Sequence, residues 1–178
     1  MAPAPLAGQV GLASPAQSLV LTATKRPSVS LALPGGSVAT LPGSLVAGPN
    51  DFAPLPIETT WDLDPAQPVS VALVAFFEAP AQAFVGEGIS IPSQAVLGKV
   101  STGGPQAYSP FTGGPVSGAG GTIGVAGGTL VLFTQPVSAE NARDGRSDAL
   151  QIRVDLTRWP DLPAGSYRGT LNLLAVTQ

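Results

Sequence analysis

Two groups of carboxylates are the residues in this sequence whose spacing could support chemistry. The 178 residues contain no histidine and no cysteine, which excludes Ser-His and Cys-His mechanisms, imidazole or thiolate metal sites, and disulfides. Asp62 and Asp64 are separated by one residue, so they project to the same side of an extended strand. That spacing could serve a cation or, less readily, glycoside hydrolysis. We favour solvent-facing residues at a strand end that leads into the Pro65 turn.

The second group is the charge-dense stretch from Glu140 to Asp148. It offers oxygen ligands at positions 140, 141, 144 and 148, but it lacks the D-x-D-x-D-G spacing of a calcium loop. Arg143 and Arg146 in the same stretch would repel a cation. We therefore predict a solvated hairpin loop with local ion pairs.

Cofactor motifs are not found in the sequence. The glycine runs at 118–121 and 127–128 do not fit G-x-x-x-x-G-K-[ST], and no helix that could supply an N-terminal dipole is expected after them. We predict no catalytic residue, no bound metal and no cofactor, and we expect the protein not to be an enzyme.

The two tryptophans, Trp61 and Trp159, raise an alternative. If they are exposed, they could form a platform for a sugar, with the 102–121 segment beside them. A monomeric carbohydrate- or surface-binding module is therefore our alternative hypothesis. In an all-β domain, however, a tryptophan more often belongs to the core or covers an edge.

Composition narrows the class of protein. Charged residues make up 11% of the chain and the net charge is −3, against the ~25% charged residues of an average soluble domain. There is no basic patch for nucleic acid. The longest apolar run, Val71–Phe77, is too short to span a membrane. No leader peptide is visible in this chain, but the low charge and the abundant Gly, Ser, Thr and Pro favour an extracellular or cell-surface location.

Alternation of apolar and polar residues is the main structural signal. Helices are expected only as one or two turns at 79–84 and 138–143, because Pro and Gly recur too often elsewhere. Alternation predicts about ten short strands. They are expected at 19–24, 28–33, 57–63, 69–77, 89–91, 95–100, 122–125, 129–134, 150–156 and 167–176. Short strands without intervening helices indicate an antiparallel sandwich or a barrel.

The 102–121 segment is the longest loop that we predict. Its composition is dominated by Gly, Pro, Ser and Thr, which favours irregular structure. We expect Tyr108 and Phe111 to hold it against the rest of the domain.

The N-terminal arm, residues 1–17, carries an apolar stripe. Leu6, Gly8, Val10 and Leu12 fall on one face of an extended strand, and flanking prolines disfavour a helix. The arm is too short to form a core of its own. It can pair as an edge strand of its own domain, stay disordered, or add as a strand to a neighbouring subunit. The last outcome gives a head-to-tail contact that builds a fibre.

The C-terminal stretch resembles the closing strands of a known group. Leu162, Pro163, Ala164, Gly165, Ser166, Tyr167, Gly169, Thr170 and Leu171 follow the pattern that commonly ends secreted bacterial Ig-like β-sandwich proteins. Residues 19–33 and 59–63 are similar to other strands of that group. The broader resemblance, over residues 18–178, is to the spore coat U and chaperone–usher pilin type of domain, although the cysteine pair that many pilins carry is absent. The resemblance implies an Ig-like fold and supplies no catalytic residue.

Together these observations predict an all-β, antiparallel Ig-like β-sandwich at 18–178, preceded by the extended arm at 1–17. Tyr167 resembles the tyrosine corner of Ig-like folds, in which the hydroxyl bonds to nearby backbone. We expect a non-enzymatic structural subunit of an extracellular fibre or surface layer, whose partners are copies of itself. Leu6, Gly8, Val10 and Leu12 are the predicted donor-strand contacts.

Overall fold

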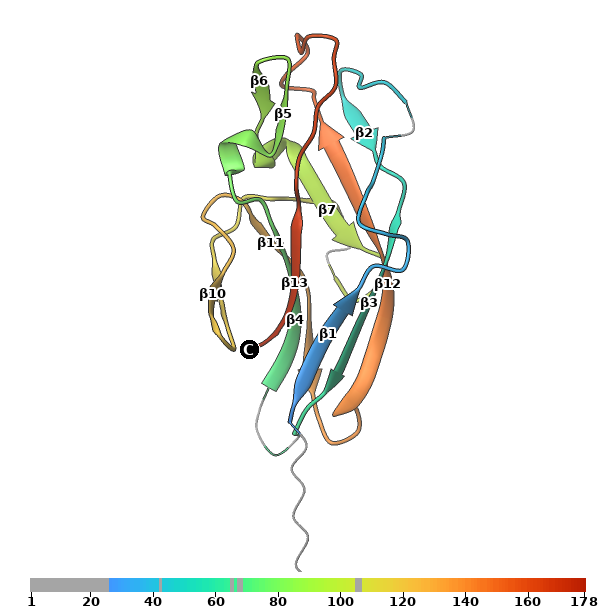
Figure 1. Ribbon diagram of the computed structural model, residues 1–178, viewed down its shortest axis with the longest axis vertical. Coiled ribbons are helices and arrows are strands. Elements are labelled where there is room, and N and C mark those ends of the chain that lie inside the picture. Colours follow the sequence, from blue (N-terminus) through green and yellow to red (C-terminus); the bar gives the residue numbers. More distant parts are fainter. Residues whose placement is uncertain (1–25, 42, 65, 67–68, 105–106) are drawn as a thin grey trace, which may run out of the picture.

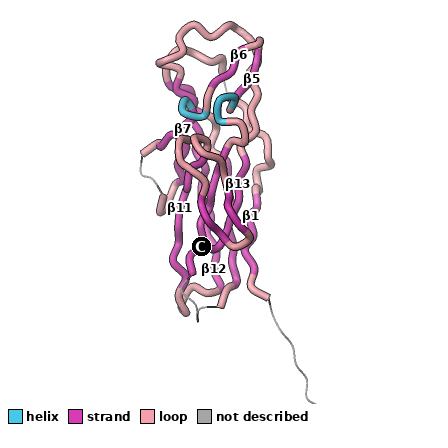
Figure 2. The backbone as a smooth tube through the Cα atoms, turned by 90° about the vertical axis from the view of Figure 1, so that its left-hand side faces the viewer, coloured by secondary structure: helices cyan, strands magenta, loops and turns pink. Residues whose placement is uncertain are grey.

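The computed structural model describes residues 26–41, 43–64, 66, 69–104 and 107–178. The described part is an elongated stack of antiparallel strands that run along its long axis (Figures 1 and 2). The predicted all-β antiparallel class is confirmed. The predicted strand at 19–24 lies outside the described residues.

A six-stranded sheet forms one layer. Its strand order is β1-β3-β12-β7-β8, with β2 paired to β12 beyond the end of β3. The strands are β1 (Ser28–Ala32), β2 (Pro49–Asp51), β3 (Leu55–Asp62), β7 (Val96–Val100), β8 (Ser109–Pro110) and β12 (Arg143–Asp155). The long strand β12 therefore joins the two halves of this sheet.

A three-stranded sheet, β11-β4-β13, forms the facing layer. Its strands are β4 (Val69–Phe76), β11 (Thr129–Val137) and β13 (Asn172–Thr177), with a bulge in β11 between Val131 and Phe133. Two small hairpins accompany it, β5 (Phe84–Gly86) with β6 (Ile89–Ile91) and β9 (Val116–Gly118) with β10 (Gly121–Ile123). Two 3-10 turns, η1 (Pro80–Gln82) and η2 (Ser93–Ala95), lie between strands.

The core fills the space between the two sheets. Alternate residues of each strand point inward: Ile57 and Trp61 from β3 and Leu150 and Ile152 from β12 pack with Leu73 from β4. The central strand β4 is apolar on both faces, as its sequence predicted, because the outer face of its sheet is covered as well.

The β9–β10 hairpin supplies that outer cover. Its Val116 and Ile123 pack against Ala72, Val74 and Val176. The hairpin is also held by a hydrogen bond from the Ala119 amide to the Thr177 carbonyl, at 2.8 Å. The three-stranded sheet is therefore enclosed on both faces along part of its length.

Several predicted elements differ from the observed ones. The predicted helix at 138–143 is a tight turn at 138–142 followed by the first residue of β12, and the one predicted at 79–84 is reduced to the 3-10 turn η1 before β5. Residues 167–171 were predicted to be strand, but β13 begins at Asn172; before it, only Arg168 forms a bridge, to Val85. The strands β2, β5, β8 and β9 were not predicted.

The prediction of a charged loop at 140–148 is wrong for most of that stretch. Arg143 begins β12, so the connection between β11 and β12 spans only residues 138–142. The strand forms because its polar residues pair across to β3: Arg143 bonds to Asp62 at 3.0 Å. Farther along, Asp148 is buried and accepts hydrogen bonds from Arg146 and Thr102.

Tyrosine and phenylalanine side chains anchor the loops, as predicted. The Tyr167 hydroxyl donates to the Pro163 carbonyl at 2.9 Å, four residues upstream, which is the contact expected of a tyrosine corner. In the 102–121 segment, Phe111 is fully buried. The Tyr108 ring lies 4.1 Å from the Arg153 guanidinium and 4.7 Å from the Lys99 ammonium.

The buried carboxyl of Asp148 predicts acid sensitivity. Burial alone raises its pKa, but hydrogen bonds from Arg146 and Thr102 and the Arg146 charge outweigh burial and hold the pKa below its ordinary 3.8. Because the folded pKa is the lower one, this stabilisation is complete above roughly pH 4 and is lost as the pH falls through the folded pKa.

We therefore expect Asp148→Asn to lower the free energy of unfolding by about 3 kcal/mol at pH 7, and by progressively less below about pH 4. Urea unfolding of both proteins between pH 7 and pH 2.5 measures this difference. Asp144→Asn is the matched control, because Asp144 is an exposed residue of the same strand. A difference that stays constant over this pH range would show that the Asp148 charge does not contribute.

Candidate functional site

The predicted donor residues Leu6, Gly8, Val10 and Leu12 lie outside the described residues. The structure therefore bears on the other half of the predicted contact, which is the surface that would accept a strand. An acceptor needs an open sheet edge for backbone hydrogen bonds and a groove for alternate side chains.

The outer edge of β13 has no hydrogen-bonded neighbour strand among the described residues, although β1 lies beside it. Ser70 and Gln178 exchange two backbone hydrogen bonds of 2.9 Å, and bonded and non-bonded pairs alternate along an antiparallel ladder. Leu173, Ala175 and Thr177 therefore direct their backbone N–H and C=O groups away from β4. The Thr177 carbonyl accepts a hydrogen bond from the Ala119 amide. Within the described part of the chain, nothing pairs with the outward groups of Leu173 and Ala175.

An apolar groove of about 470 Å³ follows this edge. One wall comes from the start of β1 and the end of β3, the other from the tip of the β9–β10 hairpin, and no charged side chain lines it. The lining residues are Pro27, Ser28, Val29, Leu63, Ala119, Gly120, Ile123, Leu174, Ala175, Val176 and Thr177. Leu174 is 43% exposed in this groove, which leaves a large apolar side chain partly uncovered.

The described chain begins beside this groove. Pro27 and Ser28, which immediately follow Arg26, are part of its lining. The start of β1 and the end of β13 lie at the same end of the molecule, the lower end in Figure 1. Thus the first described residues lie next to the groove, and β1 and β13 run in opposite directions.

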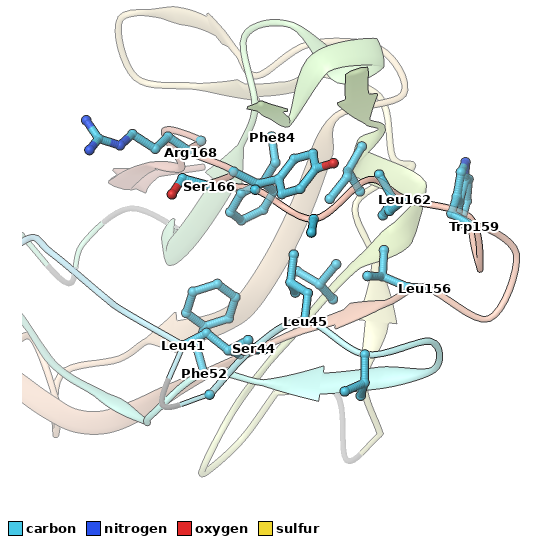
Figure 3. Close-up of a pocket in the computed structure, with 18 of the residues that line it drawn as sticks. Leu41, Ser44, Leu45, Phe52, Phe84, Leu156, Trp159, Leu162, Ser166 and Arg168 are labelled. Carbon is cyan, nitrogen blue, oxygen red and sulfur yellow. The ribbon is translucent and has the colours of Figure 1, made fainter. Parts of the chain in front are cut away.

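A second, larger cavity of about 930 Å³ lies toward the other end. One wall is the 38–47 segment together with Phe52, and the other is the 159–169 segment together with Phe84. Figure 3 shows Leu41, Leu45 and Phe52 facing Phe84 and Leu162 across the cavity. Its interior is predominantly apolar and aromatic.

Trp61 is not an exposed platform, in contrast to the alternative raised from the sequence. It is 4% exposed, and its indole N–H donates to the Asn141 carbonyl at 2.8 Å. Trp159 is half-buried and lies at the rim of the larger cavity (Figure 3). The described residues of the 102–121 segment do not line that cavity, so the three parts of the suggested sugar site are not brought together.

The paired carboxylates have structural partners. Asp62 bonds to Arg143 at 3.0 Å, and an Asp64 oxygen accepts the Ala66 amide at 3.0 Å in the turn after β3. These contacts agree with the interpretation of a strand end leading into a turn. In the part of the chain that the structure describes, no three acidic residues converge on a point where a metal ion could bind.

The charges on the outer face of the six-stranded sheet form pairs as well. Arg153 donates two hydrogen bonds to Asp51, at 2.7 and 2.8 Å, and hydrogen bonding by Arg153 contributes most to lowering the pKa of Asp51. Desolvation raises the pKa of Tyr108 above its ordinary value. The lowered pKa keeps Asp51 ionised at pH 7 and the raised pKa keeps Tyr108 neutral, so neither shift creates a reactive group at that pH.

Comparison of the chain with protein-family models and with curated proteins gives no match. None of the described helices is both long and apolar enough to cross a membrane. The groove, the cavity and the unpaired edge of β13 are therefore the features from which a function can be inferred.

The sequence contains only an indirect signal for the acceptor groove. Leu174 and Val176 alternate with the inward-facing Leu173 and Ala175, so the last strand is apolar on both faces. A strand of that kind needs cover on both sides. The sequence does not reveal that the cover over Leu174 is incomplete.

Proposed function

We propose that the protein is a non-enzymatic structural subunit that assembles head to tail, with the N-terminal arm of one copy added as a β-strand to the open edge of β13 in the next. The observation that carries the proposal is this open edge, with free backbone groups at Leu173 and Ala175 along an uncharged apolar groove. Ig-like topology and an extracellular or cell-surface location belong to the same proposal, supported by the tyrosine corner and by the low charge.

The arm and the groove are chemically complementary. Leu6, Val10 and Leu12 on one face of the arm offer apolar side chains to a groove whose lining includes Leu174 and Ile123. Gly8, in the middle of that face, allows close approach of the backbone. The arm carries no charged residue between positions 1 and 17, so no charge is buried when it docks.

Strand direction favours a partner in another copy. β1 and β13 run in opposite directions (Figure 1). In a head-to-tail stack, an arm that continues the line of β1 into the next copy would therefore run antiparallel to β13 of that copy. An arm that folded back on its own copy would run parallel to β13. Antiparallel pairing is slightly more stable per residue.

Removal of residues 1–17 tests the arm. The described core lies entirely within residues 26–178, so we expect the shortened protein to fold and to remain monomeric. Size-exclusion chromatography and electron microscopy of both proteins at equal concentration measure the difference. Filaments formed by the shortened protein would refute the proposal.

A charge in the groove tests the acceptor. Leu174 is already partly exposed, so Leu174→Lys should leave the domain folded. We expect it to reduce assembly at least ~10-fold, because docking would bury the ammonium without a partner. Thr134→Lys, on the exposed side of β11 at the other edge of the same sheet, adds the same charge and should assemble normally. Equal assembly of the two variants in sedimentation assays would exclude the β13 groove as the acceptor.

A further inference from the structure

The larger cavity is not explained by strand addition at β13 alone. Its 38–47 wall has no regular secondary structure among its described residues. Of all the large apolar side chains that the structure describes, the two most exposed lie in this wall, Val38 at 80% and Val46 at 58%. The other wall, at 159–169, leads through 170–171 directly into β13. The groove and the cavity therefore follow the same stretch of chain, 159–177.

We infer that residues 13–21 of a neighbouring copy, which are the end of its arm and the four residues that follow, occupy this cavity next to the donated strand at 6–12. The inference rests on the proposed function and extends its footprint. If residues 6–12 lie antiparallel to β13, the residues that follow them must pass the segment that precedes β13. At ~3.3 Å per residue, nine residues span about 30 Å, which is enough to run along 163–171 and reach the cavity.

The chemistry of the cavity fits this segment. Residues 13–21 carry Pro15, Leu19 and Leu21 and no charge. Phe52 and Phe84 present stacked rings 6.1 Å apart, and aromatic-lined grooves are a recurring site for proline-containing extended peptides. The Arg168 guanidinium points away from the cavity (Figure 3), so nothing in the apolar interior selects a charged ligand.

Disulfide trapping tests this placement, because the natural chain has no cysteine. One full-length protein carries Gly43→Cys, at a position that lines the cavity and where an added Cβ meets no atom within 4 Å. A second full-length protein carries Pro15→Cys, Gln17→Cys or Leu19→Cys. Gly114→Cys replaces Gly43→Cys as the matched control, since an added Cβ there is equally unobstructed and does not line the cavity.

After oxidation of the mixed proteins, we expect at least one of the positions 15, 17 and 19 to link to Cys at 43 in at least ~10-fold higher yield than to Cys at 114, because a disulfide requires Cβ atoms about 4 Å apart. Peptide mapping identifies the linked pair. Equal yields at both positions would overturn the inference.

A double variant, Leu19→Cys with Gly43→Cys, separates the two possible sources of the segment. Linkage that increases with protein concentration supports a neighbouring copy. Linkage within one chain, independent of concentration, would overturn the inference. Filaments that persist in electron micrographs while linkage at 43 shows no preference would refute only the cavity assignment, whereas the absence of filaments from the natural protein would refute the proposed function.

Discussion

Val10→Glu should reduce assembly at least ~100-fold, whereas Gln9→Glu, at the adjacent position, should leave assembly near the level of the natural protein. Val10 lies in the apolar stripe with Leu6, Gly8 and Leu12, and Gln9 lies on the opposite face of an extended strand. Burying an unpaired carboxylate in the uncharged β13 groove costs well over the ~3 kcal/mol that corresponds to a hundredfold change in affinity.

The two variants carry the same charge one position apart, so they separate side-chain burial from a general effect of net charge. Sedimentation of each protein over a concentration series, with electron microscopy of the pellets, measures the effect. Equal loss of assembly in both variants would indicate that charge alone opposes association. No loss in either would remove the arm from the interface.

The second large effect concerns stability. Phe111→Ala should lower the free energy of unfolding by about 4 kcal/mol, which is typical of a fully buried phenylalanine replaced by alanine. The Phe111 ring is fully buried and packs edge-on against Phe77, with centroids 5.2 Å apart. It also lies close to Gly98 of β7, where an added Cβ would fall 3.1 Å from the ring. The free energy of unfolding of a typical domain is only ~5–15 kcal/mol, so this loss would bring the variant close to the point where it no longer folds.

Tyr108→Ala is the matched control within the same segment. The Tyr108 ring is partly exposed and contacts Arg153 and Lys99 across its faces, and exposed contacts of this kind contribute about 1 kcal/mol or less each. Urea unfolding followed by fluorescence compares the variants. If both variants lose the same amount, the cavity created at Phe111 does not determine the cost.

Strands with strong alternation were predicted well because each has one buried face. The alternation of Ile57, Thr59 and Trp61 marks β3, and that of Ile89 and Ile91 marks β6, whereas β4 was found from its continuous apolar run. The same alternation implies that Trp61 shares the buried face with Ile57, so the burial of Trp61 was available from the sequence.

The missed strands depend on partners far away in the chain. β2 forms where Asn50 lies opposite Val154 of β12. The Asn50 side-chain amide also donates a hydrogen bond to the Val154 carbonyl. β8 has two residues and exists only through its pairing with β7. Such short segments carry no periodic pattern, and tertiary contacts decide their conformation.

The start of β12 was missed for a different reason. Asp148 and Arg146 look like loop residues because charges rarely enter a sandwich. In the structure the two side chains form an ion pair, with Arg146 Nε 2.6 Å from Asp148 Oδ2. The Arg146 guanidinium also lies 3.9 Å from the Phe133 ring centroid. A buried ion pair depends on both partners at once, so hydropathy along the chain does not reveal it.

The groove was unpredictable because its walls are brought together only by the fold. Its lining combines Ser28 in β1, Ile123 in β10 and Leu174 in β13. Which of these lies beside which depends on strand order and register, and neither is specified by local alternation.

The distance along the chain between β1 and β13 has a consequence for biosynthesis. A ribosome must make nearly the whole domain before the two sides of the groove exist together, and contacts between distant segments form late in folding. Under the proposed strand addition, a nascent chain whose arm has emerged still cannot accept the arm of another copy. The order of translation would then disfavour polymer growth onto unfinished chains without a separate inhibitor.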